Sequence, residues 1–574
     1  MFQSRKTLLC CLSACGVLFS VPSAFSDDDF VSEMVSEKAA VSVKDKRSHS
    51  YWRKPSIDKI VSSWLSRIDP LDGRYENKTI MHLDDGMSSS AREIYLHATQ
   101  YPENVQIEEG WFPMAWFEAL EDLETGKPYL ENLSRLGLLE DPNDPNGLPV
   151  GMGVTNGVVG VSCAMCHVSQ LDFKDTRVRV TGSGTPVTGQ VRLLPDLQFT
   201  FTKTLATPEL LEEYLDRILG DDALPEDRSA LKADMVAWLQ ANMSAGLTPE
   251  EFLPALLAGI EMNEGNYQAP GGHPFEVTRL LFFGFENAYF TNVMVDRPPI
   301  WGLQFTENLH YNGNTNSKVE RNLISSLNTV RQVTVDAVTN NDPKKLNQIE
   351  LAAWQIQVPA WPEDAFGKVK PYYAAKGERL YDKHCVDCHA KTHPKELTRL
   401  PEYPLELIKT DSAYFDVFDQ PIVLGDEVLP YDVAINSNID AVKFEWYEKQ
   451  GTTAAEIDPI EQGLDPEWSF RRVLVAEPMA GIWASPPYLH NGSVPSIYEL
   501  LLPAEERTKQ FPVGHTNYDP IRLGYRTDLK PGDDKFVFSV DTTQYGATNV
   551  GHEFGTSMSD YERFALIEYL KTLR

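Results

Sequence analysis

Two Cys-x-x-Cys-His motifs constrain this chain more than any other feature of its sequence. They are Cys163-Ala164-Met165-Cys166-His167 and Cys385-Val386-Asp387-Cys388-His389. In such a motif the two cysteines form thioether bonds to a porphyrin, and the histidine binds the iron on one face of the ring. These four cysteines are the only ones that follow residue 26. The motifs therefore predict two covalently bound c-type haems, with His167 and His389 as iron ligands.

The other readings of such a motif are a structural zinc site and a redox-active dithiol. Zinc needs four ligands close together, whereas each motif offers three, and more than 200 residues separate the two motifs. A redox dithiol does not need the histidine. Haem attachment is the stronger reading of both motifs.

Residues 1–26 have the features of a cleavable export signal. Arg5 and Lys6 form a short basic stretch, and the apolar run Leu8–Val21 follows it. Ala24-Phe25-Ser26 then offers a small-x-small cleavage site. The apolar run is too short to span a membrane. We therefore expect a periplasmic or secreted protein without a membrane span.

A lipid anchor is the less favoured alternative for the same segment. Leu12-Ser13-Ala14-Cys15 resembles a lipoprotein cleavage box, but the residues after Cys15 remain apolar. The net charge of −31 makes the chain a poor partner for nucleic acid or for an anionic membrane surface.

The rest of the chain divides into an arm and two predicted domains. Residues 27–50 are polar and lack periodicity, which is typical of a flexible arm. Residues 51–345 are expected to form an N-terminal haem domain, and residues 346–574 a C-terminal cytochrome c-type domain. The proline-rich stretch Val358–Pro362 lies near the boundary. The fold class expected is mainly α, with extensive irregular loops and few short strands.

Capping residues predict where several helices begin. The expected helices start at Thr207-Pro208-Glu209 (running through Leu219), at Thr248-Pro249-Glu250-Glu251, at Ala374 ahead of the second motif, and at Ser559 with Glu562. Residues 401–470 and 502–550 are rich in Pro, Gly, Asn and Asp and read as irregular.

The sixth ligand of each iron decides what the haem can do. An iron closed by a second protein ligand passes electrons, and an open iron can bind dioxygen or peroxide. The candidates for the first iron are Met235, Met243, Met262 and Met294, each more often a core residue. Those for the second iron are Met479, His490, His515, His552 and Met558. Spacing alone does not separate His552 from His490.

Several segments resemble a known family. They are Trp111–Glu121, Gly147–Gly151, Gly160–His167, Gly481–Ser496, Gly551–Gly555 and Ile567–Leu573. These segments resemble the dihaem cytochrome c peroxidase superfamily, and within it the branch that contains bacterial rubber oxygenases and dihaem fatty-acid dioxygenases. The run Pro486-Pro487-Tyr488-Leu489-His490-Asn491-Gly492-Ser493 is the most particular of them.

The resemblance implies roles for individual residues. His552 becomes the sixth ligand of the second haem, because the family's ligand histidine sits in a matching Gly-His-x-x-Gly segment. His490 matches a histidine that lies near the second haem without binding iron, and Met479 has no counterpart ligand. Trp301 resembles the aromatic residue beside the oxygen-binding haem, although it also reads as an ordinary core tryptophan.

The sequence departs from the standard peroxidases in two places, and the first departure favours the oxygenase branch. Those peroxidases carry a histidine soon after the first motif that caps the first haem, and Val178–Pro186 contains none. Leu309–Asn314 stands where they have a Phe-Trp-Asp-Gly-Arg type of segment. The missing histidine implies an open first haem.

The leading hypothesis is an exported dihaem oxidoreductase that activates dioxygen at the first haem and oxygenates an unsaturated hydrophobic small molecule or polymer. The second haem would transfer electrons, with a small electron-donor protein as a possible partner. A peroxidase acting on hydrogen peroxide is the alternative, and a non-enzymatic electron carrier is the third. Candidate pocket residues lie in Trp301–Tyr311 and Leu280–Phe285. His310 and Glu320 are possible catalytic groups that no other sequence feature supports.

Overall fold

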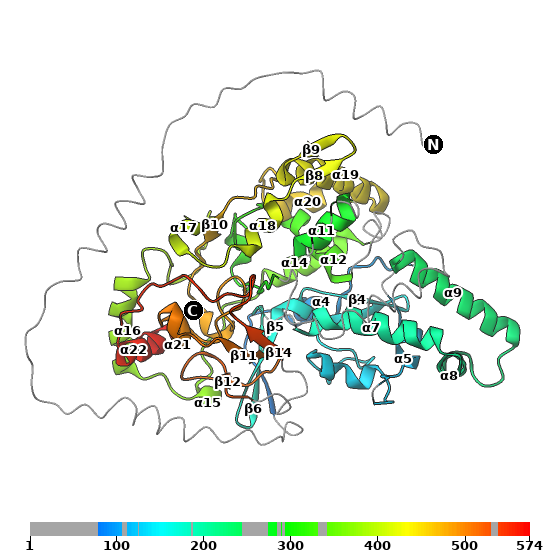
Figure 1. Cartoon of the computed structure of the whole chain (residues 1–574), viewed down its shortest axis with the longest axis horizontal. Coiled ribbons are helices and arrows are strands. Elements are labelled where there is room, and N and C mark those ends of the chain that lie inside the picture. The colour runs from blue at the N-terminus through cyan, green and yellow to red at the C-terminus, as the bar shows by residue number, and fades with distance from the viewer. Residues whose placement is uncertain are drawn as a thin grey trace, which may run out of the picture. The chain divides into compact units, whose positions relative to one another are not determined.

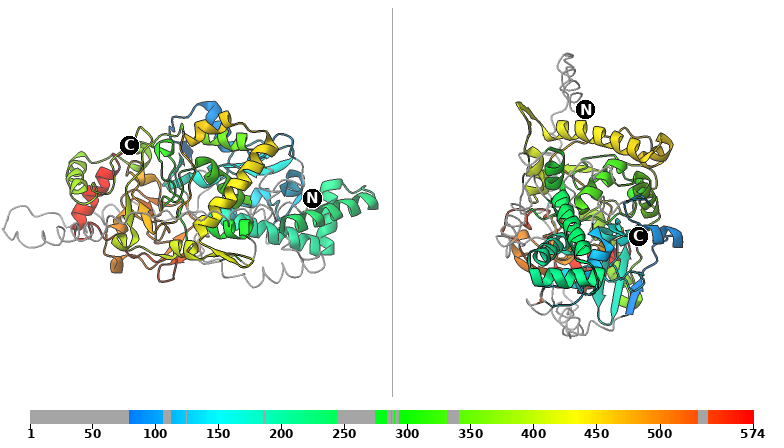
Figure 2. Two further views of the ribbon diagram at one scale, coloured as in Figure 1. Left: turned by 90° about the horizontal axis from the view of Figure 1, so that it is seen from above. Right: turned by 90° about the vertical axis from the view of Figure 1, so that its right-hand side faces the viewer.

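The structure is a computed structural model, shown in Figures 1 and 2. It describes residues 79–105, 112–123, 125–184, 188–243, 274–283, 287, 289, 293–330, 341–529 and 538–574, all of which belong to one unit, Ser56–Arg574. The predicted signal peptide, the predicted arm and the helix predicted at Thr248 lie outside these residues. No helix in the described part is both long and apolar enough to cross a membrane.

The first Cys-x-x-Cys-His motif joins two small sheets. One sheet has the order β2-β4-β3, formed by Phe112–Pro113, Val158–Val161 and Met152–Thr155, and is antiparallel. The other has the order β1-β6-β5, formed by Thr79–His82, Thr176–Thr181 and Val168–Phe173, with β1 parallel to β6. The short helix α6 (Ala164–His167) connects β4 to β5. Two paired strands therefore fix both ends of the motif.

The second motif follows helix α16 (Pro371–His384), which packs against the C-terminal helix α22 (Asp560–Leu570) (Figure 1). At the crossing, a Cβ on Gly377 would lie 2.0 Å from the carbonyl oxygen of Ala565, so only glycine allows this approach. Ser559 and Glu562 form the predicted capping box of α22. The prediction of both helices is confirmed.

The predicted helix at Thr207 is also confirmed, as α8 (Pro208–Leu219). Thr207 occupies the N-cap without a side-chain hydrogen bond, and Pro208 is the first helical residue. α8 lies between α7 (Thr188–Ala206) and α9 (Pro225–Met243) in the chain and packs against both.

The prediction that residues 401–470 are irregular is wrong. This segment contains the 20-residue helix α19 (Tyr431–Gln450), together with α17 (Leu405–Ile408), α18 (Ala413–Asp419) and α20 (Ala454–Glu461). Ile435, Ile439, Val442 and Trp446 of α19 recur at helical spacing and are all buried. Burial of this face outweighs the low helix propensity of the Asn, Ser and Asp residues between them.

The remaining strands pair two by two. They are β7 (Glu402–Pro404) with β10 (Val473–Val475), β8 (Ile422–Leu424) with β9 (Glu427–Leu429), β11 (Gln510–Val513) with β14 (Phe538–Asp541), and β12 (Tyr518–Asp519) with β13 (Gly524–Tyr525). All four pairs are antiparallel.

Three large apolar clusters form the core, and each motif packs against them. The first gathers α4 (Ser89–His97), α11 (Pro274–Phe283), α12 (Lys318–Val330), α14 (Pro343–Ala353), α18 and α19, and it touches Cys163. The second gathers α5 (Met114–Ala119), β3, β4 and α7–α9, and it touches Met165. The third gathers α16, α21 (Ile497–Leu500), α22, β5 and β6, and it touches Cys385.

The predicted domain boundary at residue 345 falls inside α14. Leu346 and Ile349 of this helix belong to the same apolar cluster as Ala91 of α4. The division into two haem domains stays a prediction.

Candidate functional site

The second motif presents one histidine with a fixed orientation. His389 Nδ1 lies 2.8 Å from the carbonyl oxygen of Glu477, to which it can donate a hydrogen bond. A histidine that donates from Nδ1 keeps the lone pair of Nε2 for a metal. Cys385 and Cys388 are free thiols, as two thioether bonds require.

His552 lies opposite His389. The centroids of the two imidazoles are 6.2 Å apart, and their planes are tilted by 51°. With metal–nitrogen bonds of about 2 Å, two imidazoles on opposite sides of one metal have centroids about 6 Å apart. His552 Nδ1 is buried without a hydrogen-bond partner. The pair could therefore hold a haem iron between its rings.

Burial keeps both imidazoles neutral. It lowers the pKa of His389, and it lowers the pKa of His552 to about 3, with the charge of Arg507 and the proximity of His389 acting in the same direction. Neutral imidazole is the form that binds a metal.

Arg507 holds the loop that carries His552. Its guanidinium is buried and donates to the carbonyl oxygens of Asn549 at 2.6 Å and Gly551 at 2.9 Å. It also reaches the carbonyls of Leu500 and Leu502, both at 3.2 Å. One side chain thus ties the ligand loop to α21.

A second contact fixes the other side of this loop. The backbone N–H of His552 donates to the carbonyl of Ile408 at 2.8 Å. A Cβ on Gly551, whose φ is +73°, would lie 2.3 Å from the carbonyl of Lys409. Glycine is therefore required where the two loops meet.

Replacing Arg507 with Gln should loosen the His552 loop without removing a ligand. The buried carbonyls would lose their charged donor. We therefore expect the free energy of unfolding of the holoprotein to fall by about 2–4 kcal/mol. We also expect part of the low-spin haem signal in the electron paramagnetic resonance spectrum to become high-spin. Lys509→Gln is the control, because Lys509 is exposed and donates only to Ala504 and, more distantly, to Asn549. An unchanged spectrum for Arg507→Gln would show that Arg507 does not position His552.

The first motif presents its histidine from the end of α6. The carbonyl oxygen of His167 accepts hydrogen bonds from the Gly182 N–H at 2.6 Å and from the Tyr95 hydroxyl at 3.2 Å. Burial lowers the pKa of His167 to about 3, with Arg297 and Arg321 acting in the same direction. The backbone of Pro298 acts in the opposite direction. The neutral ring fits an iron ligand.

The two motifs differ in what lies across from the histidine. Among the residues that the structure describes, no ring contact joins His167 to a second histidine, in contrast to the His389–His552 pair. Met235 belongs to the second apolar cluster, and Met294 to a small cluster with Phe511, Val513 and Val540. Met262 lies outside the described residues, and so does the side chain of Met243.

Trp301 contacts a residue that is hydrogen-bonded to the first motif. A Cβ on Gly182 would lie 3.4 Å from its indole, and Gly182 in turn donates to the carbonyl of His167. The Ile300 N–H donates to the Gly182 carbonyl at 2.8 Å and completes this contact. Trp301 is 2% exposed.

The same indole is connected to the second motif through neighbouring residues. Trp301 Nε1 donates to the carbonyl of Ala480 at 3.2 Å. The preceding residue, Met479, donates its N–H to Ala390, which directly follows His389. Trp301 is therefore connected to both motifs through neighbouring residues, and its predicted place beside the first haem stays a prediction.

His490 lies in an aromatic cage. Its ring contacts are with Tyr311, Tyr414 and Phe415, at centroid distances of 6.1, 5.8 and 6.3 Å. Both ring nitrogens are buried without a hydrogen-bond partner. Its predicted place beside the second haem stays a prediction.

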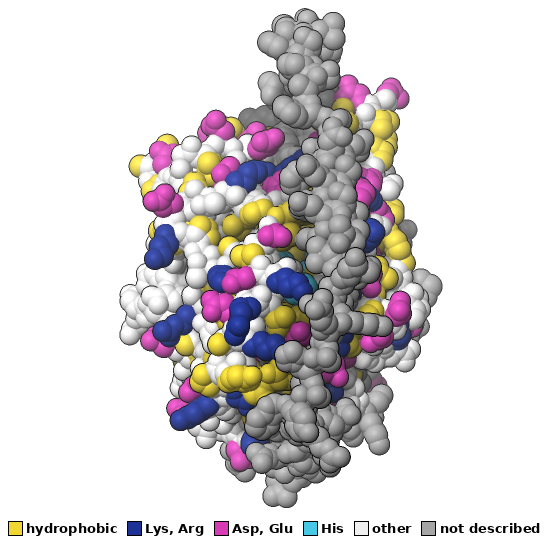
Figure 3. Space-filling view, turned by 90° about the vertical axis from the view of Figure 1, so that its left-hand side faces the viewer, with side chains coloured by type: hydrophobic (Ala, Val, Ile, Leu, Met, Phe, Trp, Pro, Cys, Tyr) yellow, Lys and Arg dark blue, Asp and Glu magenta, His cyan; other side chains and the backbone are white. Residues whose placement is uncertain are grey.

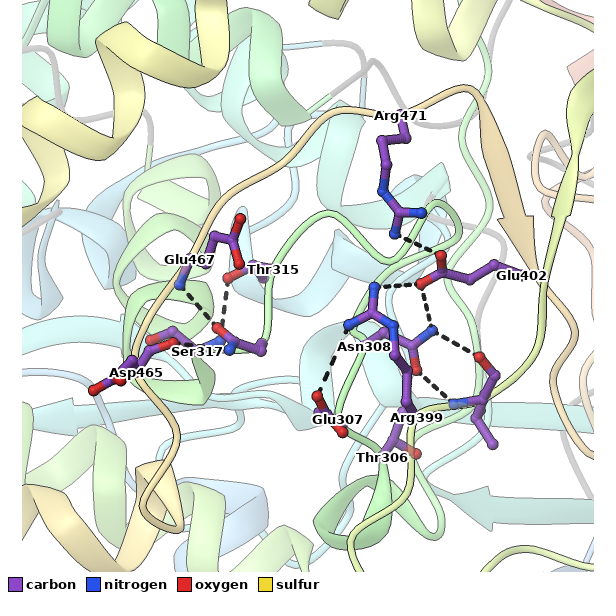
Figure 4. Close-up of polar contacts among 12 residues, drawn as sticks. Thr306, Glu307, Asn308, Thr315, Ser317, Arg399, Glu402, Asp465, Glu467 and Arg471 are labelled. Carbon is purple, nitrogen blue, oxygen red and sulfur yellow. Dashed lines mark hydrogen bonds and ion pairs between the residues drawn. The ribbon is translucent and has the colours of Figure 1, made fainter. Parts of the chain in front are cut away.

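The loop that carries His310 is fixed by polar contacts at its base (Figure 4). The Asn308 side chain donates to Glu402 at 2.9 Å and accepts from the Leu400 N–H at 2.8 Å. The carboxylate of Glu402 also forms ion pairs with Arg399 at 2.6 Å and with Arg471 at 2.5 Å. The predicted pocket segment Trp301–Tyr311 thus has a rigid end.

His310 is held by a polar contact and by aromatic packing. Its Nδ1 lies 2.7 Å from Asn314 Oδ1, and its ring packs against Phe275 and Trp468. Burial lowers its pKa to about 4. The other pocket segment, Leu280–Phe285, is described only as far as Phe283, whose buried side chain belongs to the first apolar cluster.

Glu320 is engaged in a buried ion pair. Its carboxylate contacts Lys443 Nζ and accepts from Trp468 Nε1 at 2.6 Å. Glu320 is 1% exposed and Lys443 9% exposed. These contacts occupy the carboxylate of Glu320 in a buried ion pair, which is a structural role.

Among the described residues, no three His, Cys, Asp or Glu side chains gather as a metal cage would require. A haem iron needs only one or two protein ligands. Haem is therefore the metal group that both motifs fit.

Comparison with known families agrees with this chemistry. Residues 473–512 match the family described as RoxA-like, cytochrome c-like. The matched segment includes Glu477, which accepts from His389, and Arg507, which holds the His552 loop. The chain carries a RoxA-like cytochrome c segment, which indicates a c-type haem and a haem-dependent oxidoreductase.

Two proteins of Sinorhizobium fredii are similar to this chain. The first, described as the uncharacterised protein y4iJ, is 28% identical over 575 aligned positions, which cover 86% of this chain and 93% of the relative. The second, described as the uncharacterised protein y4iM, is 26% identical over 315 positions, which cover 49% of this chain and 64% of the relative.

Proposed function

We propose that this protein is an exported dihaem oxidoreductase that uses dioxygen at the first motif to oxygenate an unsaturated hydrophobic substrate. When bound, a haem with one protein ligand at His167 supplies an open iron position, and a haem held by His389 and His552 supplies electron transfer. The second motif would maintain the redox state of the first.

The proposal rests on a difference between the surroundings of His389 and those of His167. His389 has His552 across from it at 6.2 Å between centroids, and His167 has no histidine ring across from it among the described residues. An iron with protein ligands on both faces cannot bind a substrate molecule. We therefore assign the reaction to the haem that His167 would bind.

The surroundings of His167 suit a reaction on an apolar substrate. Cys163 packs against the apolar cluster that includes Phe275, Leu323 and Trp468. Such a wall would bind a hydrocarbon and exclude water from the reacting atoms. Trp301, which is connected to each motif through neighbouring residues, would offer a path for electrons between them.

Carbon monoxide binding tests the proposal. We expect the reduced holoprotein to bind one carbon monoxide per chain, at the haem of the first motif. Oxygen uptake should then follow addition of oleate or of polyisoprene. If neither haem binds carbon monoxide, the protein is an electron carrier and the proposal fails.

A peroxidase is the second candidate, favoured by one observation. His310, held through Nδ1 by Asn314, is a neutral imidazole suited to general acid–base catalysis. The charges of Arg297 and Arg321 act on His310 as they do on His167. Turnover of hydrogen peroxide that exceeds olefin-dependent oxygen uptake, and that is lost in His310→Ala, would decide for this candidate.

A further inference from the structure

The surface beside the second motif has a charge opposite to that of the chain. The protein has a net charge of −31, yet residues 365–400 contain eight Lys or Arg residues and only four Asp or Glu residues. Figure 3 shows Lys and Arg side chains gathered in the middle of the face that includes α16 and α22, next to apolar side chains.

Three of these cations share one side of α16. Lys376, Arg379 and Lys383 follow one another at spacings of three and four residues, so they fall within one strip of the helix surface. Arg379 and Lys383 are exposed, and Lys376 is half-buried, with its Nζ 3.9 Å from the centroid of Tyr561. We refer to these three residues as the basic strip.

The acidic residues of α16 do not neutralise the strip. Glu378 and Asp382 both pair with Lys391, at 3.5 Å and 2.7 Å. Neither Arg379 nor Lys383 has an ion pair with a described residue, and the Arg379 Nε donates only to the carbonyl of Ala375. Glu562 of α22 is close enough to interact with the charges of Lys376 and Lys383, but it forms no ion pair with either of these residues. The charge of Arg379 and part of the charge of Lys383 are therefore available to a partner.

The strip ends at the haem attachment loop. Lys383 is two residues before Cys385, and Val386 between the two cysteines is 40% exposed. At the other end of the helix, Tyr372 is 74% exposed and lies on the same side as the strip. The surface thus combines a cationic row, exposed apolar groups and an accessible attachment loop.

We propose that the basic strip docks a small electron-transfer protein whose contact surface is acidic. The inference rests on the proposed function of the second motif as an electron-transfer haem. One electron passes from the donor to this haem, whose iron goes from ferric to ferrous while the donor is oxidised by one electron. A chain of net charge −31 repels an acidic protein at long range, so a local cationic surface selects where and how such a partner binds.

Stopped-flow reduction of the oxidised holoprotein tests the strip. The donor is flavodoxin, a small acidic flavoprotein, reduced to its hydroquinone. We expect the second-order rate constant at low ionic strength to fall about tenfold or more in Arg379→Glu/Lys383→Glu, and the difference to disappear at high salt. The rate constant of the neutral variant Arg379→Gln/Lys383→Gln should lie between those of the wild type and of the Glu variant. Such a graded dependence on charge would not result from a folding defect.

The matched control is Lys127→Glu/Lys232→Glu, which changes the net charge equally at two exposed lysines outside this helix. It should reduce the rate far less than the strip variant does. Equal rates for strip and control variants, with unchanged haem spectra, would overturn the inference. Loss of binding to phosphatidylglycerol vesicles, without any change in the flavodoxin rate, would assign the strip to a membrane surface instead.

A small cationic oxidant separates failure of the strip from failure of the proposed function. Tris(1,10-phenanthroline)cobalt(III) should oxidise the reduced haem of the second motif faster in the Glu variant than in the wild type. If the second-motif haem exchanges electrons with neither reagent, the proposed function fails. If it exchanges them with both, but independently of Arg379 and Lys383, only the docking inference fails.

Discussion

His552→Ala is expected to convert the haem of the second motif from low-spin to high-spin while the first motif keeps its spectrum. The imidazole of His552 lies 6.2 Å from that of His389, between centroids, and the methyl group of an alanine would be too short to reach the iron. Carbon monoxide binding by the reduced holoprotein should rise from one to two molecules per chain, because both irons would then have an open position.

Electron paramagnetic resonance and carbon monoxide titration check this result together. His490→Ala is the matched control, since His490 is also a buried histidine that spacing alone left as an equal candidate. The His490→Ala variant should still bind one carbon monoxide molecule per chain. If the second haem stays low-spin in His552→Ala, its sixth ligand is a residue other than His552. The difference between the two motifs on which the proposed function depends would then be lost.

Glu320→Gln is expected to give the largest loss of stability. The change leaves Lys443 charged, buried and without its main partner, since its other contact, Asp440, is mostly exposed. Breaking one side of a buried ion pair costs about 3–5 kcal/mol. Denaturant unfolding of the holoprotein measures the difference.

Two variants show whether the unpaired charge is the cause. Glu320→Gln/Lys443→Met removes both charges and should recover most of the stability. Glu103→Gln breaks an ion pair with Lys345 in which Glu103 is 79% exposed, and it should cost less than about 1 kcal/mol. An equally unstable double variant would contradict the role of the pair.

The same pair has a defined pH dependence. Burial lowers the pKa of Lys443, but Glu320 and Asp440 more than offset burial, so the net shift is upward. A raised pKa in the folded state means that the pair contributes its full stability below the usual lysine pKa of about 10.4. The contribution is lost only as the pH rises through the raised value. The pair therefore stabilises the protein throughout the neutral range.

Helix ends and cofactor attachment followed from short stretches of sequence. The cysteines and histidine of each motif lie within five residues, because attachment of a c-type haem is a local event along the chain. The caps at Thr207 and Ser559 are equally local, and the helices that they predict are present. α19 was missed because its signal is a buried face, which polar residues between the apolar positions obscure.

Only the tertiary structure decided which distant side chains meet. His389 and His552 are far apart in sequence, and they come together because Arg507 and Gly551 fix a loop against Ile408 and Lys409. Trp301 reaches both motifs through two unrelated backbone segments. Glu320, open to a catalytic reading in sequence, is occupied by Lys443 of another helix. Spacing along a chain cannot show such contacts, since packing between distant elements creates them.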